Sequence, residues 1–372
     1  MPNTDRAVAY INLGILEENY KKIKEKLSPH VSILCVVKAN AYGHGAVEVS
    51  RHLESLGANY LGVATIDEGI ELRVNKIKTP ILVMSGFMPW DNLDDVRQYD
   101  LTPVVYDFSI LEMLRGASKD FQQPLKIHLK FDTGMGRLGF RSHEIEKVID
   151  RMTGVDNICV DGLMSHFSSS ETRDAYGENQ VKEFKTIIDE FHQKGFRPGN
   201  IHIANSAAII NYRESHFTMV RTGISLYSSH TARELKEQLP TRQVMKFASK
   251  VALIKEFAAG SALSYGRSYV TNRITRVAYI PVGYADGYPR SLSNKGYVFI
   301  NDNRSDIVGR ICMDWFLVDI TDHDVVNIQD EVILLGESGT NVISADEIGE
   351  LAGTIPYEIL CKISKRVTRV YI

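Results

Sequence analysis

Segments rich in β-branched residues alternate with segments of helical period over the first two-thirds of this 372-residue chain. Helices are predicted at 45–56, 66–75, 107–117, 142–152 and 178–194. Strands are predicted at 31–37, 60–64, 80–84, 102–106, 125–131, 159–165, 200–204 and 218–221. Eight strand–helix repeats in roughly 230 residues match the (β/α)8 barrel (TIM-like). The catalytic groups of this fold lie at the C-terminal ends of its strands.

A different pattern begins near residue 240. Short β-branched runs at 250–254, 276–280, 296–300 and 331–335 are separated by turn residues. This pattern is typical of a mostly antiparallel β domain. We therefore divide the chain into a barrel domain at 1–240 and a β-rich domain at 241–372.

Composition excludes several classes of protein. The net charge of −3 gives no electrostatic case for binding nucleic acid or an anionic membrane. No apolar run approaches the roughly 18 residues that a membrane helix needs, and the N-terminus lacks the apolar core of a signal peptide. The cysteines, which are Cys35, Cys159, Cys312 and Cys361, are far apart and indicate free thiols in a reducing compartment. We expect a cytoplasmic protein.

Lys38 ends the apolar run 33–37 and is followed by a loop rich in Gly, His and Tyr. An ammonium at the end of a buried strand loses hydration, so its pKa falls and the free amine can attack a carbonyl group. A lysine that only caps a strand in solvent is the ordinary alternative, because lysine is mostly exposed. Gly43 and Gly45 favour the other interpretation, since they let the backbone approach an anion, and Tyr42 adds a donor.

Polar residues follow several of the other predicted strands at the same end of the barrel. Asp132 and Arg137 follow the fifth strand, His166 the sixth, Asn205 and Ser206 the seventh, and Arg221 and Gly223 the eighth. Taken singly, a core histidine, an ion-pair arginine or a helix-capping serine is the ordinary interpretation. Their common placement indicates one site. The absence of a P-loop or a GxGxxG motif argues against a nucleotide phosphate, and we expect no metal.

The segment 33–45 resembles the lysine motif of the bacterial alanine racemases, which depend on pyridoxal 5'-phosphate. At least seven motifs match the family in its order, among them 130–139, 163–167, 205–208, 263–267, 309–314 and 354–358. The resemblance implies interconversion of L-alanine and D-alanine by two-base transfer of the α-proton, which supplies D-alanine for peptidoglycan. A serine or broad-specificity racemase of small amino acids is the alternative. The resemblance also implies a homodimer with shared active sites.

The same resemblance implies roles for individual residues. Lys38 would carry the cofactor and act as one base, and Tyr265 would be the second base, contributed across the dimer interface. Arg221, supported by His166, would donate to the pyridine nitrogen and make the ring a weaker electron sink. The phosphate would be bound by Tyr42, Asn205, Ser206, Gly223, Ile224 and Tyr357.

Substrate contacts are implied in the same way. Arg137 would contact the substrate carboxylate and a cofactor oxygen. The resemblance also makes Lys130 the candidate for carbamylation, which would hold that arginine. Alternation points Lys126, His128 and Lys130 to one side of a strand, and we expect this side to face the barrel interior. Met313 would bind substrate, while Tyr284 and Asp314 would line the access corridor.

Two other classes were compared with this interpretation. A decarboxylase of the same architecture would have a longer chain and a catalytic cysteine in a different context from Cys312. A non-catalytic cofactor-carrying protein would be close to a single barrel and would not need residues 240–372. The second domain, with Tyr265 in it, favours a racemase.

Overall fold

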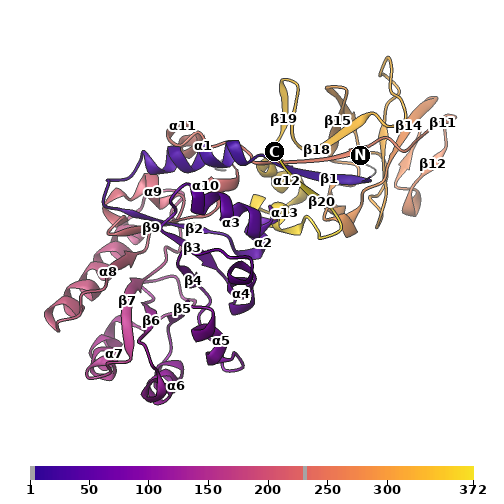
Figure 1. Cartoon of the computed structure of the whole chain (residues 1–372). Helices are drawn as coiled ribbons and strands as arrows, with labels where there is room; N and C mark the ends of the chain where they lie inside the picture. Colours follow the sequence, from indigo (N-terminus) through magenta and orange to yellow (C-terminus); the bar gives the residue numbers. More distant parts are fainter. Residues whose placement is uncertain (1–4, 229–232) are drawn as a thin grey trace.

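Parallel strands form a nearly closed barrel in the first domain (Figure 1), as predicted. The computed structural model describes residues 5–228 and 233–372. The 8-stranded sheet has the order β8-β7-β6-β5-β4-β3-β2-β9. Its strands are β2 (Ser32–Val36), β3 (Tyr60–Val63), β4 (Ile81–Val83), β5 (Leu101–Val105), β6 (Leu125–Lys130), β7 (Ile158–Met164), β8 (Asn200–His202) and β9 (Met219–Thr222). Each predicted strand is confirmed within two residues at either end.

Backbone hydrogen bonds bring the two end strands of this sheet together. The Thr218 N–H donates to the Ile201 carbonyl at 3.3 Å, and the Arg221 N–H donates to the Ala204 carbonyl at 2.9 Å. Most residues of these strands are apolar and buried, which explains why the strands are nearly continuous apolar runs rather than alternating ones. The closure places the C-terminal ends of β2 and β6 to β9 around one opening.

Longer helices cover the outside of the barrel, and short helical turns lie at the ends of its strands. They are α1 (Leu13–Lys24), α2 (Lys38–Tyr42), α3 (Ala46–Ser55), α4 (Ile66–Val74), α5 (Leu93–Gln98), α6 (Phe108–Ala117), α7 (Ile145–Met152), α8 (Ala175–Gln193), α9 (Ala208–Asn211), α10 (Ile224–Tyr227) and α11 (Arg233–Gln238). The predicted helices correspond to α3, α4, α6, α7 and α8. Helix α8 begins earlier than predicted because the Asp174 side chain caps it, accepting from the Gly177 N–H at 2.7 Å. In the described part of the chain, no helix is long and apolar enough to cross a membrane.

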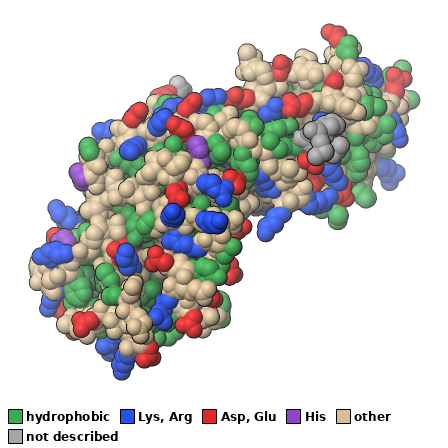
Figure 2. Space-filling model, in the orientation of Figure 1, with side chains coloured by type: hydrophobic (Ala, Val, Ile, Leu, Met, Phe, Trp, Pro, Cys, Tyr) green, Lys and Arg blue, Asp and Glu red, His purple; other side chains and the backbone are tan. Residues whose placement is uncertain are grey.

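The second domain is mostly antiparallel, as predicted. One sheet has the order β16-β15-β18-β10-β1-β20 with β19 beside β18, a second has β11-β14-β17, and β12 and β13 form a hairpin. The elements are β10 (Met245–Lys250), β11 (Leu253–Phe257), β12 (Ala262–Leu263), β13 (Tyr269–Val270), β14 (Thr275–Ile280), β15 (Tyr297–Ile300), β16 (Asn303–Asp306), β17 (Phe316–Asp319), β18 (Glu331–Ser338), β19 (Asn341–Ile343), α12 (Ala345–Ala352), α13 (Pro356–Lys362) and β20 (Thr368–Tyr371). On the face shown in Figure 2, Lys and Arg side chains are mixed with Asp and Glu side chains over both domains.

Strand β1 (Ala7–Ile11) departs from the division of the chain at residue 240. It lies in the sheet of the second domain, antiparallel to β10 and parallel to β20 (Figure 1). Ala7, Val8, Ala9 and Ile11 are buried there. The first and last strands of the described residues therefore both lie in the β domain, and the barrel connects β1 to β10.

We predict that Ala9→Pro destabilises the β domain more than the barrel. Ala9 pairs with Phe247 on one side and Arg369 on the other, and proline would remove the N–H group and disturb both ladders. The free energy of unfolding should fall by roughly 3 kcal/mol or more. Ala9→Gly keeps the N–H group and should cost only about 1 kcal/mol.

Urea denaturation and hydrogen exchange of amides in β10, β20 and β3 would measure this effect. Protection lost equally in β3 and in β10 would contradict an effect centred on the second domain.

Candidate active site

Lys38 begins a turn whose backbone is left-handed. The φ angles of Ala39, Asn40, Ala41 and Tyr42 are 52°, 55°, 52° and 52°. Left-handed conformation costs an L-residue roughly 1–2 kcal/mol. Four consecutive non-glycine residues in this region are therefore strained, and such strain persists only where the surrounding structure imposes it.

Side chains from both domains hold this turn. Within the barrel domain, the two Glu68 carboxylate oxygens accept from the Ala39 N–H at 2.7 Å and from the Ala64 N–H at 2.6 Å. From β20, the Arg369 guanidinium donates to the Gly43 carbonyl at 3.1 and 3.0 Å. Gly43 itself has a φ of 81°, and a Cβ there would lie 2.2 Å from the Leu360 carbonyl oxygen. The position of Lys38 thus depends on the packing of the two domains.

A cavity of about 530 Å³ opens at the C-terminal ends of the barrel strands. It brings together many of the residues singled out from the sequence, which are Lys38, Tyr42, Lys130, Arg137, His166, Asn205, Ser206, Arg221, Gly223, Ile224 and Tyr357. Tyr357 comes from α13, so the second domain closes one side. Met84, Ser85 and Glu171 also line the cavity and were not predicted.

Tyr265, Tyr284, Met313 and Asp314 are not part of this cavity. They lie on the second domain, where Tyr265 is 70% exposed and Met313 is 54% exposed. Val270, Ile274 and Trp315 are further exposed apolar side chains of this domain. The single chain does not bring these residues to Lys38.

The electrostatics of the cavity favour an anionic ligand. Among its described lining residues, Lys38, Lys130, Arg137 and Arg221 are cationic and Glu171 is acidic. Burial, followed by repulsion from Arg137, lowers the pKa of Lys38. Burial and the two arginines lower the pKa of Lys130 to about 8. Within residues 5–228 and 233–372, no cluster of His, Cys, Asp and Glu is placed to hold a metal ion.

Arg221 is buried, and its hydrogen-bond partners among the described residues are all neutral. One terminal nitrogen donates to His202 Nδ1 at 2.7 Å, and the other donates to His166 Nδ1 at 2.9 Å. Backbone carbonyls of Ser165, His202 and Ile203 accept the remaining bonds. Burial, and then repulsion from Arg137, lowers the pKa of Arg221 to about 9. Burial and the Arg221 charge hold the pKa of His166 well below its usual range.

A chain of hydrogen bonds continues from Arg221 through the barrel interior. Because arginine only donates, His202 Nδ1 accepts, and its Nε2 is then free to donate to His128 Nδ1 at 2.8 Å. His128 Nε2 in turn faces the Asp161 carboxylate at 3.3 Å. Asp161 also accepts from Tyr60 and Asn200, both at 2.8 Å. This chain fixes the neutral tautomer of each imidazole.

The prediction for the inward face of β6 is wrong at one position. His128 and Lys130 are buried, but Lys126 is exposed. Lys126 is the second residue of β6, so it lies at the opposite mouth of the barrel, where solvent reaches it. His202 and Asp161 were not predicted, and the one available signal was a polar residue within each predicted strand.

The loop after β6 presents Arg137 to the cavity. Asp132 Oδ1 accepts from the Gly134 N–H at 2.9 Å and from the Gly136 N–H at 3.0 Å. The Asp132 N–H donates to the Phe140 carbonyl, and the Phe140 N–H donates to the Lys130 carbonyl, both at 2.9 Å. The loop is therefore closed by backbone bonds, and Arg137 extends from a fixed base.

Hydroxyl groups gather at the other end of the cavity. Ser206 Oγ accepts from the Gly223 N–H at 2.9 Å, which leaves its own proton available to an anion. The Tyr42 ring stacks on Tyr227 with centroids 5.0 Å apart and lies 5.9 Å from Tyr357. Burial raises the pKa of Tyr42 and raises that of Tyr357 to about 12. Both phenols therefore remain donors at neutral pH.

Fold and cavity together define a barrel enzyme that presents the partly buried amine of Lys38 among cations and hydroxyl donors. Comparison with known proteins identifies its family. The family models of the alanine racemase N-terminal and C-terminal domains match residues 11–231 and 244–371. The chain belongs to the alanine racemase family.

Individual relatives agree over nearly the whole chain. The alanine racemase of Halothermothrix orenii is 41% identical, over 98% of this chain and 96% of the relative. The crystal structure of alanine racemase from Streptomyces lavendulae is 33% identical with a TM-score of 0.94, covering 100% of this chain and 98% of that one. Alanine racemase from Bartonella henselae, solved with covalently bound pyridoxal phosphate, is 30% identical with a TM-score of 0.88 over 99% of each chain.

We predict that Lys38 titrates below the 10.5 of an ordinary lysine in the protein freed of ligands. Burial and Arg137 disfavour the ammonium, so the reactive neutral amine should form at lower pH than on exposed lysines. Arg137→Met should move the midpoint upward, because it removes one repelling charge.

Labelling with trinitrobenzenesulfonate as a function of pH, with peptide mass spectrometry, measures the midpoint. Arg151→Met, on α7 and paired with Glu112, is the control and should leave the midpoint unchanged. A Lys38 midpoint at or above 10.5 would contradict the argument.

Proposed function

We propose that the protein interconverts L-alanine and D-alanine, with pyridoxal 5'-phosphate bound covalently to Lys38. The observation that carries the proposal is a partly buried lysine of lowered pKa in the wall of a cavity dominated by cations. The relatives reported above are named alanine racemase, which supports alanine as the substrate. Nothing in them supports the alternative of a serine or broad-specificity racemase.

The cavity residues fit this cofactor. Its phosphate would be bound by the hydroxyl and backbone donors at one end, which come from Tyr42, Asn205, Ser206, Gly223, Ile224 and Tyr357. Arg221 would donate to the ring nitrogen, because it is held by His166 and His202 and points a fixed charge into the cavity. When bound, the cofactor supplies the electron withdrawal that makes the α-proton of an amino acid acidic.

The protein's own groups would then move that proton. Racemisation needs a base on one face of the α-carbon and an acid on the other. The neutral Lys38 amine can accept or return the proton on one face. Tyr265 of the partner subunit would serve the opposite face. It would give a proton to the α-carbon in one direction of the reaction and take the proton from it in the other direction.

Arg137 and Lys130 would position the substrate. Arg137 extends from a closed loop and would bind the carboxylate of the amino acid by two parallel hydrogen bonds. Lys130 has a pKa of about 8, so a substantial fraction is neutral near physiological pH and open to carbamylation. A carbamate would replace a repelling cation beside Arg137 with an anion that holds it.

A homodimer with shared sites would complete this machinery. Tyr265 and Met313 are more than half exposed, and exposed apolar side chains accompany them on the second domain. Contact with a second copy would bury this surface and bring Tyr265, Tyr284, Met313 and Asp314 to the partner's cavity. We propose a small amino acid as the substrate, and we expect the protein to bind neither nucleic acid nor a membrane. The free cysteines support a cytoplasmic location.

We predict that protein purified with pyridoxal 5'-phosphate and reduced with borohydride carries a pyridoxyl group on the Lys38 peptide. Before reduction it should racemise alanine, followed by circular dichroism of the amino acid. Serine and other small amino acids assayed in parallel measure substrate breadth. Labelling at another lysine would refute the assignment of Lys38, and faster turnover of serine would favour the alternative.

We further predict that inactive Lys38→Ala and Tyr265→Phe proteins regain activity when their subunits are mixed. A hybrid dimer contains one site with both bases intact and one with neither, so activity should approach half that of a wild-type dimer. Isolation of the hybrid by two different affinity tags controls for incomplete exchange. An isolated hybrid without activity would refute the shared site.

A further inference from the structure

Two loops of the second domain are joined into one unit. The loop 283–286 carries Tyr284, and the loop 312–314 carries Met313 and Asp314. The Tyr284 N–H donates to the Cys312 carbonyl and the Ala285 N–H donates to the Met313 carbonyl, both at 3.1 Å. Gly283 permits this approach, because a Cβ there would lie 2.2 Å from the Met313 carbonyl oxygen. We refer to 283–286 and 312–314 as the loop pair.

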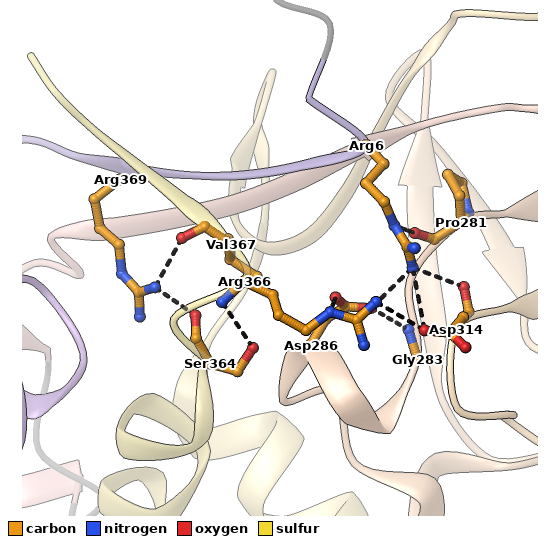
Figure 3. A network of polar contacts seen from close by, with 9 residues as sticks. All are labelled: Arg6, Pro281, Gly283, Asp286, Asp314, Ser364, Arg366, Val367 and Arg369. Carbon is orange, nitrogen blue, oxygen red and sulfur yellow. Dashed lines mark hydrogen bonds and ion pairs between the residues drawn. The ribbon is translucent and has the colours of Figure 1, made fainter.

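Two arginines from opposite ends of the chain fasten the loop pair (Figure 3). Arg6 donates to the Asp286 carboxylate at 3.3 Å, to the Asp314 carbonyl at 3.1 Å and to the Pro281 carbonyl at 2.9 Å. Arg366 lies 3.5 Å from the other Asp286 oxygen and donates to the Asp314 carboxylate at 2.8 Å. Each loop therefore contacts both guanidinium groups.

Asp286 is the centre of this network. Its side chain is only 3% exposed, and a buried carboxylate is retained only where charges and donors compensate for its lost hydration. One oxygen accepts from the Gly283 N–H at 2.9 Å, and the Asp286 carbonyl accepts from the Ser364 N–H at 3.1 Å. The network thus ties the loop pair to the segment that leads into β20.

The two arginines have a rigid base. Arg6 immediately precedes β1 and Arg366 precedes β20, and these strands are neighbours in the central sheet of the second domain. A displacement of either arginine would require movement of this sheet. The loop pair is consequently anchored to this sheet through the two arginines, although Tyr284 and Met313 are exposed.

We propose that Arg6 and Arg366 are positioning residues that hold the loop pair of one subunit in the shape in which it enters the active site of the other subunit. The proposal rests on the proposed shared site, in which Met313 contacts substrate. Neither arginine lines the cavity that contains Lys38 of its own chain. Their effect on catalysis should therefore appear only in the partner's site.

Arg369 provides a matched contrast within the same segment. It is three residues from Arg366, but its guanidinium donates to Gly43, next to the turn that carries Lys38 of its own chain. Figure 3 shows Arg366 extending toward Asp286 and Asp314, whereas Arg369 bonds to Ser364 and Val367. Substitution of Arg369 should affect the site of its own subunit, and substitution of Arg366 the site of the partner.

The test uses Arg366→Met in two hybrid dimers, each with one active site. In the first, an Arg366→Met subunit is paired with a Lys38→Ala subunit, so the active site combines an intact Lys38 with an intact loop pair. In the second, a wild-type subunit is paired with a Lys38→Ala/Arg366→Met subunit, so the active site receives the altered loop pair. Both hybrids contain the same substitutions in total, and both are isolated by two tags.

We expect a wild-type KM in the first hybrid and a KM raised about three- to tenfold in the second, with a smaller change in kcat, because a misplaced loop pair loses binding of the substrate. With Arg366→Lys in place of Arg366→Met, the rise in KM should be smaller, because lysine keeps the positive charge. Arg273→Met, which breaks an exposed ion pair with Asp322 in the same domain, should change nothing. When Arg369→Met replaces Arg366→Met in the same two hybrids, the first hybrid should be impaired and the second should behave as wild type.

Hydrogen exchange of the Tyr284 and Ala285 amides gives a measure that does not depend on activity. It should become faster in Arg366→Met while exchange in β10 stays slow, which would exclude general unfolding. Equal KM values in the two hybrids would overturn the proposal. An inactive hybrid of one Lys38→Ala subunit and one Tyr265→Phe subunit would instead refute the shared site itself. The two failures are therefore distinguishable.

Discussion

The left-handed turn after Lys38 is the constraint on which the geometry of the site depends. Four L-residues with positive φ are held there at a cost of several kcal/mol, so the restraint must come from outside the turn. Glu68 supplies it from the barrel domain and Arg369 from β20. The position of the Lys38 amine thus depends on the packing of the two domains, and a barrel alone would not fix it.

The charge of Arg221 in the barrel interior is also controlled by its neighbours. Arg221 is separated from the Asp161 carboxylate by two neutral imidazoles, those of His202 and His128. A carboxylate in direct contact would neutralise the guanidinium. The intervening rings instead orient it and leave its positive charge directed at the cavity, where Lys38 and Arg137 add to the same potential. An anion entering the cavity relieves this repulsion.

Most strands and the position of Lys38 could be predicted because each is a local pattern: an apolar run, and its interruption by one lysine. Other features depend on partners distant in sequence. The contact between His128 and His202 exists only once the barrel closes, and alternation alone does not show that Lys126 lies at the exposed end of β6. The left-handed turn gave no local signal either, because Ala39 and its neighbours are residues that usually avoid positive φ.

Strand β1 has a consequence for the order in which the polypeptide can assemble on the ribosome. It is synthesised before the barrel, yet its partners β10 and β20 are synthesised after the barrel. The barrel, whose strands pair with near neighbours in sequence except for β2 with β9, can close while β1 is still unpaired. The sheet that supports Arg6 and Arg366 can be completed only once β20 has left the ribosome, and its long-range pairing is intrinsically slow. The barrel can therefore form before the surface that a second subunit would contact is complete.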